Sequence, residues 1–145
     1  ESALQMYDAV MSNSLQADII IMSAAVSDYR PKEFSQQKIK RDKGEITLIL
    51  EENPDILAEL GKNKRDGQII VGFSMETENL LENSIKKLKK KNADFIVAND
   101  LSKEGAGFGT DTNIVTIISA DGEVKELPLM SKHDVANAIF DFIIK

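Results

Sequence analysis

Three short, nearly continuous apolar runs constrain the fold of this chain more than any other feature of its sequence. They span residues 17–23, 68–73 and 93–98. Continuous apolar runs of this length are typical of strands that are buried on both faces. Stretches with helical periodicity lie between them, and strands that alternate with helices predict a parallel sheet covered by helices on both sides.

The remaining elements complete an α/β prediction. Helices are predicted over residues 2–15, 54–60, 80–91 and 131–144, and a further strand over residues 45–50. Asn53 is a plausible N-cap for the second helix, with Pro54 in the first helical position and Gly61 as the residue that ends it. Residues 114–119 and 124–127 predict a hairpin, because Asp121-Gly122 favours a two-residue type I′ turn. We expect a three-layer, Rossmann-like, mostly parallel sheet with helices on both faces and an antiparallel hairpin at its edge.

Composition excludes several classes of function. The chain has 145 residues, a net charge of −6, no cysteine and a single histidine, His133. These counts exclude a disulfide scaffold, a thiolate zinc site and a cysteine nucleophile, and they leave little material for a Ser-His-Asp triad. The acidic balance argues against wholesale binding of nucleic acid or anionic membranes. No apolar run approaches the roughly 18 residues of a membrane span, so we expect a cytoplasmic protein. The length of the chain suits one domain. We interpret His133 as structural.

The segment after the first predicted strand is the first candidate site. Residues 24–43 are polar, basic and aperiodic, and loops of this length are usually functional or disordered. Asp28 would lie at the carboxyl end of a strand, where it could bind a sugar hydroxyl or Mg²⁺, or could simply hydrogen-bond to its own turn. Lys38, Lys40 and Arg41 could close over a triphosphate, or could be solvated surface.

Two other features have both a functional and a structural interpretation. Lys87 and Lys91 are four residues apart on the predicted third helix, where they could hold adjacent phosphates. Lysines near a helix C-terminus also complement its dipole, which explains most of them without a ligand. Phe73, at the end of the second buried run, could stack on a base or could pack in the core.

Eight motifs, taken together, resemble the ligase domain of phosphopantothenate–cysteine ligase. They are Ser-Ala-Ala-Val-Ser-Asp-Tyr-Arg-Pro at residues 23–31, Lys-Ile-Lys-Arg at 38–41, Asn-Pro-Asp-Ile at 53–56, Val-Gly-Phe at 71–73, Glu-Thr at 76–77, Asn-Ala-Asp at 92–94, Ala-Asn-Asp at 98–100 and Phe-Gly-Thr-Asp-Thr-Asn at 108–113. In many bacteria this domain is the C-terminal half of a bifunctional decarboxylase/synthetase flavoprotein. The motifs run in the family's order, and the first, followed by a basic lid, is the most specific.

The resemblance implies an activity and a set of site residues. The implied reaction belongs to coenzyme A synthesis: 4′-phosphopantothenate reacts with CTP to give an acyl cytidylate, and cysteine then displaces CMP. CTP and Mg²⁺ are implied, with Asp28 as the metal-binding residue, and no flavin is expected in this domain. Lys38 and Arg41 are the implied catalytic residues. The implied nucleotide-binding residues are Ala24, Ala25, Asp28, Lys38, Pro54, Asp55, Ile56, Leu57, Phe73, Lys87 and Lys91.

Departures from the family pattern shape the remaining expectations. Arg41 stands where the family's lid motif ends in lysine. In this family the ligase domain begins with a strand and a phosphate-binding turn, and neither precedes Glu1. We therefore expect an N-terminally truncated ligase domain over residues 1–145, with weak or no turnover. We also expect a flexible lid near residues 26–44. A homodimer, formed through the hairpin edge, and a fused decarboxylase domain are implied partners. A noncatalytic nucleotide- or polyanion-binding module and an ATP-using ligase are the alternatives.

Overall fold

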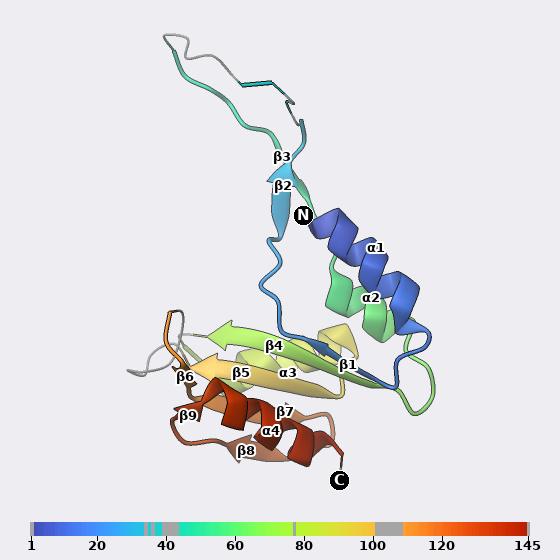
Figure 1. Ribbon diagram of the computed structural model, residues 1–145, viewed down its shortest axis with the longest axis vertical. Helices are drawn as coiled ribbons and strands as arrows, with labels where there is room; N and C mark the ends of the chain where they lie inside the picture. Colours follow the sequence, from blue (N-terminus) through green and yellow to red (C-terminus); the bar gives the residue numbers. More distant parts are fainter. Residues whose placement is uncertain are drawn as a thin grey trace.

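The computed structural model describes residues 2–33, 35, 37–38, 44–76, 78–100 and 109–144. Its central sheet contains five strands in the order β1-β4-β5-β7-β8 (Figure 1). Their bounds are β1 Ile19–Met22, β4 Ile69–Glu76, β5 Phe95–Asp100, β7 Val115–Ser119 and β8 Val124–Glu126. The first three run parallel, whereas β7 and β8 add to the sheet as an antiparallel hairpin. The predicted arrangement of a parallel core with an antiparallel edge is therefore confirmed.

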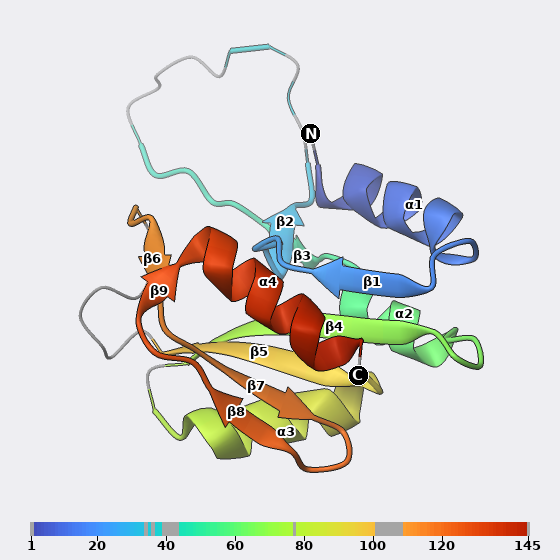
Figure 2. The ribbon, with the colours of Figure 1, turned by 60° about the horizontal axis from the view of Figure 1, so that its bottom comes forward.

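Four helices cover the two faces of this sheet. They are α1 Ala3–Ser14, α2 Ile56–Lys62, α3 Leu80–Lys91 and α4 Lys132–Ile143. α4 crosses one face (Figure 2), whereas α2 and α3 pack on the other, with α1 beside α2. None of these helices is long and apolar enough to cross a membrane, within the part of the chain that the structure describes.

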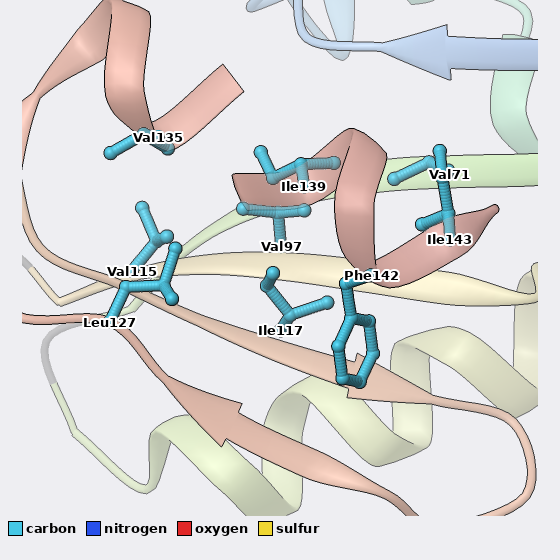
Figure 3. Packing of buried hydrophobic residues seen from close by; sticks show 9 residues of the cluster. All are labelled: Val71, Val97, Val115, Ile117, Leu127, Val135, Ile139, Phe142 and Ile143. Atoms are coloured by element: carbon cyan, nitrogen blue, oxygen red, sulfur yellow. The ribbon is translucent and has the colours of Figure 1, made fainter. Parts of the chain in front are cut away.

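Alternate residues of each strand supply two separate cores, because successive side chains of a strand point to opposite faces. In β4, Ile70 faces α2 and α3 while Val71 faces α4, and both are completely buried. The core under α4 is shown in Figure 3. Its ring pair, Phe95 and Phe142, meets edge to face with centroids 5.9 Å apart. This two-sided burial explains why the three strand sequences are continuously apolar.

A two-stranded ribbon projects from the domain, and it corrects the sequence prediction. β2 Tyr29–Pro31 pairs antiparallel with β3 Leu50–Glu52 (Figure 1). We had expected a loop throughout residues 24–43 and a strand over residues 45–50. Only Leu50 of that expected strand lies in β3. An alternating sequence forms a strand only where a neighbouring strand pairs with its backbone, and β2 provides just three such residues.

The start and end of α2 also differ from the prediction. Asp55, not Asn53, is the N-cap, and its carboxylate accepts a hydrogen bond from the Ala58 backbone N–H (3.0 Å). Gly61 lies inside the helix, which continues to Lys62. A Cβ atom at Gly61 would lie 1.8 Å from the backbone oxygen of Lys91, so the glycine permits close approach to α3 rather than ending α2.

The turn of the β7–β8 hairpin is longer than predicted. Ser119 and Glu123 still face each other through the Ser119 N–H, which donates to the Glu123 carbonyl (2.9 Å). Three residues, Ala120 to Gly122, therefore form the loop. Gly122 is the only one of them with a positive φ, +96°, which is typical of a type I turn followed by a glycine bulge. Two further strands, β6 Thr112–Asn113 and β9 Met130–Ser131, pair antiparallel beside α4.

Candidate functional site

A cavity of about 430 Å³ opens at the carboxyl end of β1, beside the middle of β4. Three segments form its walls: the loop after β1, the segment that leads from β3 into α2, and the C-terminal half of α3. It is lined by Met22, Ala24, Val26, Ser27, Asp28, Tyr29, Glu52, Asn53, Pro54, Asp55, Ile56, Leu57, Phe73, Lys87 and Lys91. Open parallel sheets bind ligands at this edge, and the volume lies within the range of ligand pockets.

The cavity brings together most of the residues that the sequence singled out. Nine of them line it: Ala24, Asp28, Pro54, Asp55, Ile56, Leu57, Phe73, Lys87 and Lys91. Ala25 is exposed and does not line it. Lys38 is also exposed and lies outside the lining, and Arg41 lies outside the described residues. The catalytic roles of Lys38 and Arg41 therefore stay predictions.

Two lysines of α3 supply the positive charge of the pocket. Lys87 donates to the backbone oxygen of Phe73 in the middle of β4 (3.2 Å), which fixes its ammonium group beside the cavity. Lys91 forms an ion pair with the carboxylate of Asp55, and only 14% of the Lys91 side chain is exposed. An ammonium group has three donor hydrogens, so each lysine can hold a protein acceptor and an anionic ligand at once.

Three carboxylates, those of Asp28, Glu52 and Asp55, also line the cavity. The carboxylate of Asp55 accepts a hydrogen bond from the Ala58 N–H and forms an ion pair with Lys91. Asp28 is exposed and forms no ion pair with a described residue. No group of three or more metal-binding side chains occurs among the described residues. Mg²⁺ commonly uses one or two carboxylates together with phosphate oxygens of a substrate. Asp28 therefore fits a metal that arrives with a phosphorylated ligand, and it does not fit a metal held by protein alone.

The apolar floor of the pocket depends on a glycine. Leu57 and Phe73 both line the cavity. A Cβ atom at Gly72 would lie 2.5 Å from Leu57 Cδ2 and 3.0 Å from Ile96 Cδ1. Gly72 in β4 thus leaves room for Leu57 to lie flat against the sheet, which keeps the space above it open.

Several residues that line the pocket were not predicted from the sequence. Asn53 was interpreted as a helix cap, and Ser27, Tyr29 and Glu52 were not assigned to a site. Ser27 and Tyr29 flank the predicted Asp28, so their position next to it was the available signal. Asn53 likewise stands directly before the predicted Pro54, but its contacts to the loop after β1 leave no local signal, because their partners lie more than twenty positions away. His133, at the exposed start of α4, does not line the pocket.

The sequence matches a known protein family over its whole length. Residues 1–145 match the family described as "DNA/pantothenate metabolism flavoprotein C-terminal domain", abbreviated DFP. The chain belongs to this family. The "Coenzyme A biosynthesis bifunctional protein CoaBC" of Bacillus subtilis (strain 168) is 49% identical over 143 residues, which cover 99% of this chain and 35% of the relative. This DFP domain thus spans about a third of the length of that relative.

Other proteins agree with this assignment. A prokaryotic protein of unknown source, described as "Cysteine/Cysteine sulfinic acid decarboxylase", is 43% identical over 143 residues, 99% of this chain and 40% of the relative. A crystal structure of the C-terminal domain of CoaBC superposes with a TM-score of 0.79 at 41% identity, covering 99% of this chain and 61% of that one. A Cab2 mutant in complex with phosphopantothenate-cysteine shares the fold, with a TM-score of 0.66, 22% identity, and coverage of 87% and 44%.

Proposed function

We propose that this DFP domain binds the nucleotide for a ligase that joins 4′-phosphopantothenate to cysteine in coenzyme A biosynthesis. The main support is the pocket, where six of the predicted residues, from three separate family motifs, meet two lysines of α3. Further support comes from the relatives, because a 49% identical protein is a coenzyme A biosynthesis protein and a structure of the same fold contains phosphopantothenate-cysteine. The proposed nucleotide is CTP, with Mg²⁺ bound to its phosphates.

The reaction needs positioning and positive charge more than a side-chain nucleophile. The carboxylate of phosphopantothenate attacks the α-phosphorus of CTP; a new P–O bond forms and pyrophosphate leaves. The amine of cysteine then attacks the acyl carbon, CMP leaves, and an amide results. Lys87 and Lys91 would stabilise the charge on the phosphates, while Asp28 would hold the Mg²⁺ that neutralises it further. Phe73 would border the base.

The partners form the second part of the proposal. We infer a homodimer. Its support comes from the β2–β3 ribbon and the segment before β3, a different surface from the hairpin edge expected from sequence, because Tyr29, Ile46, Leu48 and Leu50 are each more than half exposed. Large apolar side chains gathered in this way typically mark an interaction surface. A fused decarboxylase is supported by the relative, which is described as bifunctional and is almost three times as long as the matched region.

Titration calorimetry of the 145-residue chain tests the nucleotide site. CTP, ATP and tripolyphosphate are titrated at a fixed Mg²⁺ concentration into the wild type, Lys87→Gln and Lys90→Gln. Lys90 is the matched control, because it lies on the same helix but does not line the pocket. We expect CTP to bind in preference to ATP, with about tenfold weaker binding in Lys87→Gln and no change in Lys90→Gln.

Two other results of this titration would contradict the proposal. If CTP and tripolyphosphate bind equally and affinity falls steeply with salt, the chain is a polyanion-binding module. Equal losses in Lys87→Gln and Lys90→Gln would also show that the lysines of α3 attract anions from outside the pocket.

A further inference from the structure

Asn53 joins two walls of the pocket at one point. Its backbone N–H donates to the carbonyl of Asp28 (2.7 Å) and its side-chain Nδ2 donates to the carbonyl of Ser27 (2.8 Å). All three residues line the cavity. The loop after β1 is thus attached to the segment that leads into α2, across 25 positions of sequence.

Arg30 holds this junction from the other side. Its Nη1 donates to the side-chain oxygen of Asn53 (3.0 Å) and to the backbone oxygen of Glu52 (2.7 Å). Its Nη2 forms an ion pair with Glu51 (2.8 Å). One guanidinium group therefore contacts three consecutive residues, and 29% of its side chain is exposed.

The loop that these contacts fix has little regular structure of its own. Residues 23–28 form neither helix nor strand. Among the described residues, the hydrogen bonds to the Ser27 and Asp28 carbonyls come from Asn53. Such a loop has many conformations, and ordering it when a ligand binds costs free energy that would weaken binding.

We propose that Asn53 and Arg30 are positioning residues, which hold the two walls together and so form the pocket before the nucleotide arrives. The inference rests on the proposed function, because it assigns these residues to the nucleotide site. Asparagine suits the position because one short side chain offers both a donor and an acceptor. Arginine suits its position because a planar fork reaches several acceptors at fixed angles, which lysine cannot do.

Three variants of the chain test this role. Asn53→Ala removes both side-chain contacts, and Arg30→Lys keeps the charge but loses the fork. Asn63→Ala is the matched control: Asn63 Nδ2 donates to the Glu59 carbonyl (2.9 Å) at the far end of α2, outside the pocket. CTP with Mg²⁺ is titrated calorimetrically at a temperature where circular dichroism shows every variant to be folded. Amide hydrogen exchange is measured at residue 53, whose backbone N–H donates to the Asp28 carbonyl.

We expect CTP to bind about tenfold more weakly to Asn53→Ala, several-fold more weakly to Arg30→Lys, and equally well to Asn63→Ala. Exchange at residue 53 should accelerate about tenfold in Asn53→Ala and stay unchanged in the control. A residue that only stabilises the fold would leave the affinity of folded protein unchanged. If Asn53→Ala does not fold, Arg30→Lys decides the question.

Two results would overturn the inference. The first is a CTP affinity within twofold of the wild type in both Asn53→Ala and Arg30→Lys. The second is a loss of affinity in Asn63→Ala equal to theirs. If the wild type binds neither CTP nor ATP, the proposed function fails instead. In that case, the exchange rate at residue 53 still decides whether Asn53 and Arg30 hold the two walls together.

Discussion

Replacing Gly61 with alanine tests the close contact that sets α2 against α3. In a solvent-exposed helix this substitution would be stabilising by up to about 1 kcal/mol, because alanine has the higher helix propensity. Here the added Cβ would lie 1.8 Å from the backbone oxygen of Lys91, whereas Cβ atoms essentially never come within 3.0 Å of another heavy atom. The two helices must therefore separate by more than 1 Å.

The cost of this separation exceeds the gain in propensity. Overpacking a buried contact typically costs about 1–3 kcal/mol, and a backbone oxygen cannot rotate out of the way. The Gly61 carbonyl also accepts a hydrogen bond from Asn92 Nδ2 (2.8 Å), and its loss would cost about 1 kcal/mol more. We expect a net loss of about 1–3 kcal/mol, or a Tm lower by roughly 4–12 °C. Separating α2 from α3 also pulls Asp55 from Lys91, so CTP binding should weaken.

Thermal unfolding followed by circular dichroism measures this effect. Gly44→Ala is the control, because a Cβ at Gly44 meets nothing within 4 Å and its φ is not positive. Its free energy of unfolding should change by less than about 0.5 kcal/mol. An unchanged or higher Tm for Gly61→Ala would refute the reasoning, since it would show that the helices move apart at almost no cost.

Three further predictions concern the core and the pocket. Phe142→Ala should lower the free energy of unfolding by about 3–5 kcal/mol in urea denaturation, because this residue of α4 is 97% buried between the helix and the sheet. A loss below about 1 kcal/mol would contradict the packing. Gln68→Ala should cost about 1–3 kcal/mol in the same assay, because its Nε2 donates to the backbone carbonyls of Ser14, the last residue of α1, and of Ala17 (both 2.7 Å); a neutral result would mean that water replaces the amide. Gly72→Ala should push Leu57 into the cavity and weaken CTP binding several-fold in calorimetry, and unchanged affinity would show that Leu57 moves elsewhere.

Much of the fold could be predicted from sequence, because its strands and helices bury their own side chains in regular patterns. α3 matches its predicted bounds, and the three apolar runs contain β1 and much of β4 and β5. The candidate site was predicted mainly through the family resemblance, which implied nine of the residues that line the pocket. Ala25 and Lys38 carry motif signals as well, yet they lie outside the lining, because a motif does not specify where a loop side chain points.

The sequence by itself determined the central sheet and the helices that cover it, since periodicity reports which face of each of these elements is buried. Only the tertiary structure decided the roles of Asn53 and Gly61. Local signals favoured a helix cap at the first and a helix end at the second. Their partners, Ser27 and Lys91, are 26 and 30 positions away, and each contact exists only because the packed sheet brings distant backbone together. Such contacts leave no local pattern, and in this protein they define the shape of the pocket.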